Sequence, residues 1–228
     1  MNTRSFSALF VLFAIGSEAQ AQCESAYTAD RLAADLGAMS EALRSANRAA
    51  FQTRGDVMTD GLPCVDAPLA PVVLANVYRY AGLSAYFGGD SNRAAAWFRS
   101  SLELDSSFDW DVKDVPVNDP IRSVFEAQRQ QAGVEKIDAA GGRALADSNA
   151  HRLLADGRAL TEPRLTPDRP HLIQKIVVAT NSVESVWLVE GADLPASLLG
   201  DAQIAVASSD EGAKFEVQKI ERTRPPMK

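Results

Sequence analysis

The sequence predicts an α+β fold, in which antiparallel helical hairpins are followed by a small antiparallel β domain. Apolar residues recur at helical intervals through the first part of the chain, and short runs rich in β-branched residues follow. The 228 residues are 46% hydrophobic, which leaves room for one or two cored domains. We expect a signal peptide over 1–21, a helical domain over 22–133, a β-rich domain over 134–222 and a flexible tail over 223–228.

The first 21 residues predict an export signal. Arg4 precedes an apolar run over 8–16, and Ala19-Gln20-Ala21 has the small-x-small form that signal peptidase cleaves after. The run is too short to span a bilayer, which needs about twenty apolar residues in a helix. We therefore expect an exported protein, periplasmic or secreted, with no stable membrane insertion after the signal is removed.

The two cysteines predict a disulfide between Cys23 and Cys64. Disulfides form in oxidising compartments, so an even cysteine count in an exported chain favours a bridge. Two separate thiols are the alternative. A lipid on Cys23 is disfavoured, because Gln22 stands where a small residue is expected before an acylated cysteine.

The helical part begins with an amphipathic helix over 29–43, where Leu32, Leu36, Met39 and Leu43 recur at intervals of four, three and four. Ser45-Ala46-Asn47 ends this helix. A second helix over 48–58 then reaches a Gly-Leu-Pro-Cys sequence, in which glycine and proline stop it. The two helices form the first predicted hairpin.

A second hairpin is predicted around the Gly88-Gly89-Asp90 turn. Small residues, Gly82 and Ala94, fall where two antiparallel helices come closest, and Tyr78 and Phe98 fall where the pair packs. Over residues 75–108 this pattern resembles a tetratricopeptide (TPR) repeat, and the weaker hairpin before it makes the unit resemble a degenerate TPR protein. The chain departs from the family pattern at Ala85, Ser101 and Ser106.

The TPR resemblance implies a groove that binds a protein or peptide. The family's groove-lining positions fall here on Asn76, Arg79, Leu83, Tyr86 and Phe87. Arg79 with Asn76 is suited to bind a peptide carboxylate or backbone, and Tyr86 offers contact area. The alternative is that the groove is filled by the chain's own segment or by the β half.

A fifth helix is predicted after Asp119-Pro120, an N-cap followed by a first-turn proline. Beyond residue 133 the pattern changes, and Gly141-Gly142 and Asp156-Gly157 signal turns. Short apolar runs predict strands at 151–154, 171–178, 185–189, 203–206 and 214–220. Residues 154–158 and 170–173 faintly resemble the PEGA type of bacterial envelope β module.

No sequence motif that signals a particular reaction is present. His151 and His171 lie in predicted strands without a third ligand at fixed spacing, which is weak support for a metal. The carboxylates Asp105, Asp109, Asp111, Asp114 and Asp119 suggest calcium binding or hydrolysis, but the run lacks the glycine of a calcium loop. A solvated connector whose aspartates cap helices is the plainer interpretation.

These features favour a non-enzymatic interaction or scaffold module of the bacterial cell envelope, with no cofactor. A calcium-binding or hydrolytic protein that uses the aspartates, or a purely structural subunit of an envelope assembly, is the alternative. The formal net charge is −7, and neither half has the basic excess that nucleic acid or anionic lipid would attract. The oligomeric state and the partner's identity are not encoded in any motif.

Overall fold

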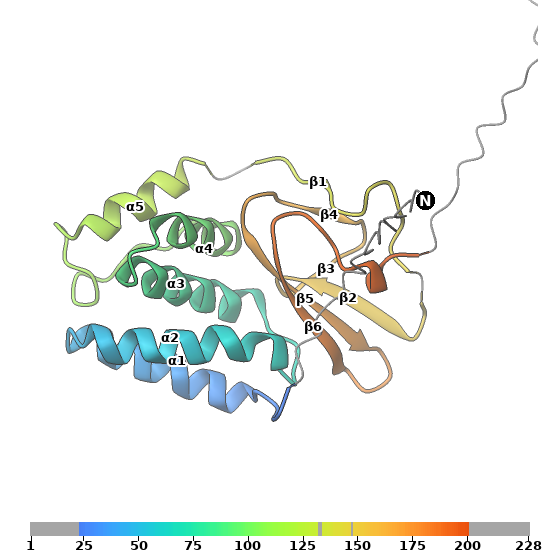
Figure 1. Ribbon diagram of the computed structural model, residues 1–228, viewed down its shortest axis with the longest axis horizontal. Coiled ribbons are helices and arrows are strands. Elements are labelled where there is room, and N and C mark those ends of the chain that lie inside the picture. The colour runs from blue at the N-terminus through green and yellow to red at the C-terminus, as the bar shows by residue number, and fades with distance from the viewer. Residues whose placement is uncertain (1–22, 132–133, 147, 201–228) are drawn as a thin grey trace, which may run out of the picture.

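The computed structural model describes residues 23–131, 134–146 and 148–200. Paired helices form one side of the molecule and small antiparallel sheets the other, so the predicted α+β class is confirmed (Figure 1). The predicted signal, the strands at 203–206 and 214–220 and the tail lie outside the described residues. No helix in the described ranges is long and apolar enough to cross a membrane.

The first helical pair consists of α1 (Ala29–Arg44) and α2 (Arg48–Gly61). Each helix begins at a side-chain cap: Thr28 Oγ1 accepts a hydrogen bond from the Arg31 amide, and Asn47 Oδ1 accepts one from the Ala50 amide. Such caps satisfy amide groups that the first turn of a helix leaves unpaired. Both helices therefore start close to where the sequence predicts.

The disulfide between Cys23 and Cys64 is confirmed. Cys64 ends a short 3-10 helix, η1 (Leu62–Cys64), that continues from α2. Beside the bridge, the Tyr27 amide donates to the Cys64 carbonyl oxygen over 2.8 Å. The bridge and this hydrogen bond hold the segment before α1 against the end of α2.

The second pair, α3 (Pro71–Phe87) and α4 (Ser91–Leu104), packs closely because of Gly82. A Cβ atom at Gly82 would lie 2.5 Å from the ring of Phe98, so no larger residue fits without movement. Gly89 has a φ of +85°, which glycine adopts at little cost, and Asp90 caps α4. The predicted turn is present.

The last helix, α5 (Pro120–Arg129), begins at the predicted Asp119 cap, whose Oδ1 accepts from the Ile121 amide. Phe125 on α5 packs edge-to-face on Phe98 of α4, with 5.2 Å between ring centroids. Phe108 and Trp110, from the connection between α4 and α5, join the same aromatic cluster. This connection is therefore part of the helical core.

The main sheet has the order β3-β2-β5-β6, and all its neighbouring strands are antiparallel. A separate two-stranded sheet pairs β1 with β4. Three predicted strands are present as β2, β5 and β6, whereas the two-residue strands β1, β3 and β4 were not predicted. The elements are β1 (Ile137–Asp138), β2 (His151–Ala155), β3 (Arg158–Ala159), β4 (Arg164–Leu165), β5 (Pro170–Val177), β6 (Ser182–Glu190) and the 3-10 helix η2 (Ala196–Leu198).

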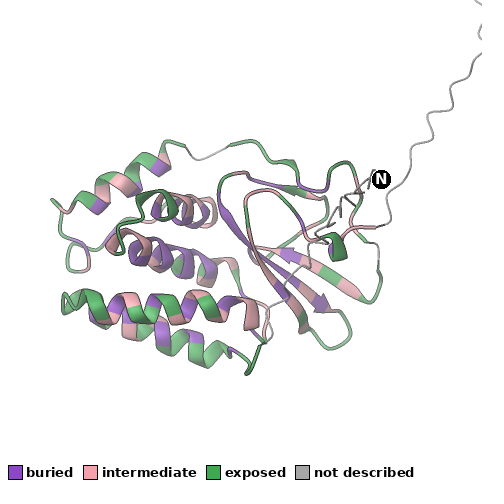
Figure 2. Cartoon of the chain, viewed as in Figure 1, coloured by how far each residue is buried: buried purple, intermediate pink, exposed green. Residues whose placement is uncertain are grey.

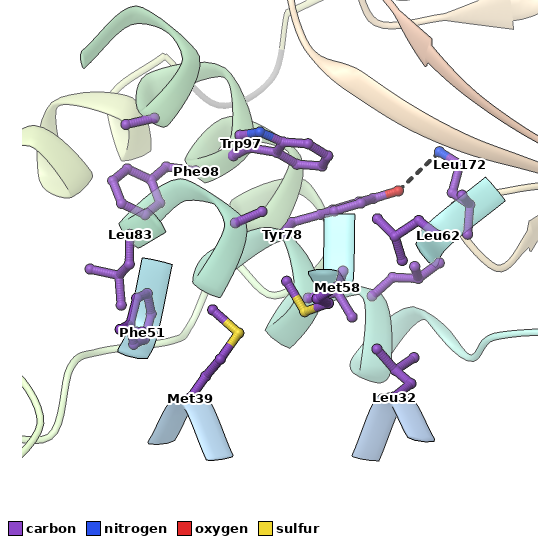
Figure 3. Close-up of a cluster of buried hydrophobic side chains, with 14 of the residues drawn as sticks. Leu32, Met39, Phe51, Met58, Leu62, Tyr78, Leu83, Trp97, Phe98 and Leu172 are labelled. Atoms are coloured by element: carbon purple, nitrogen blue, oxygen red, sulfur yellow. Dashed lines mark hydrogen bonds between the residues drawn. The ribbon is translucent and has the colours of Figure 1, made fainter. Parts of the chain in front are cut away.

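Strand β5 lies between two hydrophobic cores, which explains why it is buried on both faces (Figure 2). Leu172 belongs to the core that the helices form, together with residues such as Leu62 and Tyr78 (Figure 3). Ile173, its neighbour, packs with Leu165 and other residues on the opposite face. The alternation of side chains along a strand thus joins the helices, the sheet and the outer segments.

Candidate functional site

At Arg79, the face of α3 that the TPR resemblance assigned to a partner is covered by the chain's own connection between α4 and α5. The Arg79 side chain is only 7% exposed, and its guanidinium lies 3.2 Å above the ring centre of Phe108. Arg79 also donates to Asp105 Oδ2 over 3.3 Å and to Asn76 Oδ1 over 2.7 Å. Burial lowers the pKa of Arg79 to about 10, although the charge of Asp105 acts to raise it.

The five residues predicted to bind a partner do not form one open surface. Leu83 is fully buried in the helical core, and the Arg79 side chain is buried against the connection between α4 and α5. Asn76 is exposed, but its carboxamide oxygen is held by Arg79. Tyr86 and Phe87 are half-buried, and Phe87 lines a separate 240 Å³ pocket together with Phe51. Partner contact by the whole set would require this face to open.

The aspartate cluster serves local structure. Asp109 pairs with Arg122, Asp114 pairs with Arg44 over 3.0 Å, and Asp119 caps α5. Asp111 Oδ1 accepts from the Lys113 amide inside its own turn. No group of three or more His, Cys, Asp or Glu side chains in the described part of the chain is placed to hold a metal. The carboxylates thus fold the connector and cap a helix.

A buried polar junction joins α3 to the sheet through Tyr78, Asp156 and His171. His171 Nδ1 lies 2.6 Å from Asp156 Oδ2, and Nε2 lies 2.8 Å from the Thr166 carbonyl oxygen. Burial lowers the pKa of His171, but the hydrogen bond to Asp156, the charge of Asp156 and the Thr166 carbonyl together raise it above the ordinary value.

The junction has no free base. A carbonyl oxygen only accepts hydrogen bonds, so His171 Nε2 carries a proton, and Nδ1 is occupied by Asp156. Tyr78 donates its hydroxyl proton to Asp156 and accepts from the Leu172 amide over 3.0 Å (Figure 3). Because both ring nitrogens and the hydroxyl are engaged, the arrangement holds the sheet against α3 and leaves no group to activate a nucleophile.

The open site lies on the opposite side of α3, between α2 and α4. It is a groove of 530 Å³ whose floor includes Ala81, Ser84 and Ala85. At about 100° per residue these positions point away from Arg79. A run of small residues leaves the floor low, so the side chains of α2 and α4 form its walls. The wall residues are Ala49, Gln52, Thr53, Asp56, Thr59 and Asp60 from α2, and Asp90, Arg93 and Trp97 at the start and in the first turns of α4.

A second hollow continues this groove toward the sheet. It has a volume of 620 Å³ and lies between the first half of α4 and the segments at the start of β5 and the end of β6. Asp90, Arg93 and Trp97 line both hollows. We call the two together the outer groove. It runs from α2 across α4 to Arg169 and Glu190.

Most of the described residues that line the outer groove are polar: they carry carboxylates, hydroxyls, carboxamides and guanidinium groups. The hydroxyls of Thr53 and Thr59 donate to the carbonyl oxygens of Ala49 and Gly55 in their own helix, over 3.0 and 2.8 Å. Among the residues of 23–131, 134–146 and 148–200, neither histidine nor cysteine lines it. Hydrogen bonding and charge are therefore what it can offer a ligand.

Neither a known protein family, nor a curated protein, nor a solved structure matches this chain. The fold and the groove define an α+β protein in which a layer of paired helices, joined to a small antiparallel sheet, presents an open polar groove. The sequence contains one signal for this groove, the small residues Ala81, Ser84 and Ala85 at helical spacing. These small residues form the floor of a groove only because α2 and α4 pack on either side of α3, and the sequence does not show that packing.

Proposed function

We propose that the protein is a non-enzymatic binding module of the bacterial cell envelope, in which a TPR-like helical unit docks a protein or peptide partner in the outer groove. The observation that carries this proposal is an open polar groove, which three helices and the edge of the sheet form over a buried hydrophobic core. The predicted export signal and the disulfide fit an extracytoplasmic location.

The open, continuous shape of the groove and its polar lining support a peptide chain rather than a small molecule as the ligand. Small-molecule sites are commonly concave and mostly apolar, and they bury most of the ligand. The outer groove instead consists of two connected hollows with many polar wall residues. An extended segment can follow such a surface and use its own backbone for hydrogen bonds.

The experiment is to fill the groove and to measure partner recovery. Thr53 is exposed on the α2 wall, so Thr53→Trp places a large ring in the groove without disturbing the core. Ser123, exposed on α5, provides the matched control Ser123→Trp. After chemical crosslinking in the native cells, we expect the wild type and Ser123→Trp to recover the same partner, and Thr53→Trp to lose most of it.

Two outcomes would count against the proposal. One is that no protein is recovered reproducibly with the wild type. The other is that Thr53→Trp recovers the partner as well as Ser123→Trp does, while both variants melt at the wild-type temperature.

A further inference from the structure

We infer that the 240 Å³ pocket beside Phe87 is a second binding site, which takes an apolar residue at the C-terminal end of a peptide chain. The terminal side chain enters the pocket, and Arg48 and Lys113 bind the terminal carboxylate. We call this site the end pocket. Among the described residues it shares no lining residue with the outer groove, so the inference does not depend on the proposed function.

Four segments form the end pocket: the end of α1, the start of α2, the end of α3 and the connection between α4 and α5. Its apolar floor includes Phe51 and Phe87, whose rings pack edge-to-face with 5.5 Å between centroids. Phe51 is fully buried, so core packing fixes this part of the floor. An apolar cavity of about 150 Å³ holds a benzene ring, so 240 Å³ accommodates an aromatic or branched aliphatic side chain.

Three cations and two carboxylates line the end pocket, and both carboxylates are already engaged. Asp114 pairs with Arg44 over 3.0 Å, and Asp119 caps α5. The other two cations, Arg48 and Lys113, have no ion pair within the described residues. In a chain whose formal net charge is −7, this local excess of positive charge favours an anionic group in the ligand.

The position of Arg48 suits a carboxylate. Its guanidinium lies 5.2 Å from the ring centre of Phe87, within the range of a cation–π contact. Contact with a ring leaves the guanidinium donors available for hydrogen bonds, and a carboxylate accepts two of them side by side. The ring therefore holds a carboxylate-binding group directly beside the apolar floor.

Exposed apolar residues near the end pocket indicate a ligand longer than one group. Val112 is 59% exposed and Val117 is 68% exposed, and both lie in the same connection as the lining residues Lys113 and Pro116. They offer apolar surface outside the cavity, on which residues before the terminal one can pack. A free small acid would fill the cavity and leave the valines bare. The end of a peptide uses the cavity, the cations and the valines together.

Calorimetry with defined peptides tests the inference on the mature chain. The probe is acetyl-Ala-Ala-Ala-Phe with a free C-terminal carboxylate. One control is the same peptide with a C-terminal amide, and the other is acetyl-Ala-Ala-Ala-Gly with a free carboxylate. We expect the probe to bind and each control to bind about tenfold more weakly, because the first lacks the charge and the second lacks the apolar side chain.

A pair of matched variants tests the two cations. Arg48→Gln/Lys113→Gln removes both, and both residues are exposed, so the core is not disturbed. We expect this variant to raise the Kd of the probe about tenfold. The control Arg31→Gln/Arg158→Gln removes two exposed arginines outside the pocket, and Arg31 also contacts a ring, 5.3 Å from the centre of Tyr27. The Kd of the control should stay within about twofold of the wild type.

Equal binding of the acid and amide peptides, equal weakening by the two variants, or no binding of the probe would each overturn the inference. Phenylpropionate, a small acid with the same ring, separates a peptide end from a free acid. If it binds as tightly as the probe, the residues before the terminus contribute nothing and the assignment to a peptide end is wrong. None of these results depends on the outer groove, where Thr53→Trp tests the proposed function.

Discussion

Among single residues, Tyr78 makes the contact that most directly joins the two halves of the chain. Its hydroxyl donates to Asp156 and accepts from Leu172, and the side chain is fully buried. Burial and the nearby Asp156 carboxylate raise the pKa of Tyr78 well above its ordinary value, so the hydroxyl keeps its proton. The sequence predicts Tyr78 as a packing residue, but its hydrogen-bond partner lies 78 residues away and leaves no local signal.

The hydroxyl can be removed without changing the ring. We expect Tyr78→Phe to lower the free energy of unfolding by about 1–3 kcal/mol, because the Asp156 carboxylate loses a buried hydrogen bond. The Leu172 amide keeps Asp156 Oδ1 as its acceptor, over 2.9 Å. The control is Tyr86→Phe at a half-buried position, whose hydroxyl has no hydrogen bond shown within the described residues. Urea denaturation measures both variants, and an equal effect of the two would contradict the assigned role.

His171 predicts how stability depends on pH. Because its folded pKa lies above the unfolded value of about 6.5, its contribution is complete below that pH and is lost as pH rises through the folded pKa. We expect the free energy of unfolding of the wild type to fall across this window, and His171→Gln to remove that part of the slope. Val183→Ala, an apolar truncation in the same sheet, should keep it. A slope that His171→Gln leaves unchanged would contradict the assignment.

At the level of elements, the local sequence predicts where the helices begin. It predicts only some of the contacts between them. Capping residues and apolar periodicity act over one or two turns, so the helix starts at Ala29, Arg48 and Pro120 are readable. The strands β1, β3 and β4 have two residues each, which is too short to show an alternation of apolar and polar residues. Arg79 is covered by the ring of Phe108, which lies 29 residues later in the sequence. The two come into contact only when the connection after α4 folds back over α3.

Two glycines make a matched test of helix packing. Gly82 faces Phe98, whereas a Cβ at Gly37 in α1 would meet nothing within 4 Å. We expect Gly82→Ala to destabilise the protein by about 1–3 kcal/mol through overpacking. Gly37→Ala should stabilise it by about 0.5–1 kcal/mol, since alanine is the better helix former. Thermal unfolding measures both, and a stabilising Gly82→Ala would show that α3 and α4 pack less closely.

The disulfide joins the segment just before α1 to the 3-10 helix at the end of α2. It joins residues 41 apart in sequence, and closing a loop of this size removes about 4 kcal/mol of chain entropy from the unfolded state. We therefore expect Cys23→Ala/Cys64→Ala to lower the free energy of unfolding by up to that amount. Reductant should destabilise the wild type similarly and leave the variant unchanged. If reductant has no effect on the wild type, the bridge does not stabilise this fold.

For the molecule as a whole, the sheet and the helices share one core. Leu172 of β5 and Val186 of β6 pack with the helical residues, and Gln174 Nε2 donates to the Ala67 carbonyl oxygen over 3.1 Å. The sequence indicates a helical part and a β part, but not how they lie against each other. That arrangement depends on side chains of β5 pointing to both faces of the sheet.

A shared core predicts cooperative unfolding. Leu172→Ala should destabilise the protein by about 2–5 kcal/mol, because it removes buried volume between helices and sheet. In native-state hydrogen exchange, we expect peptides from α3 and from β5 to lose protection by the same amount. If only the β5 peptides lose protection, the two parts unfold separately.

The candidate site could be predicted from the sequence only in small part. The TPR resemblance directs attention to Arg79 and Leu83, which the fold buries. The outer groove lies on the other side of α3 and depends on the spacing of α2, α4 and the sheet. Only the completed fold brings these walls together.

Site-specific photo-crosslinking in the native cells tests the central claim, that a partner docks in the outer groove. A benzophenone side chain is placed at Thr53 or Asn92, which line the groove, or at Asn76, exposed on the opposite face of α3. We expect the same partner adduct from Thr53 and Asn92, and none from Asn76. Adducts from Asn76 without adducts from the two groove positions would contradict it.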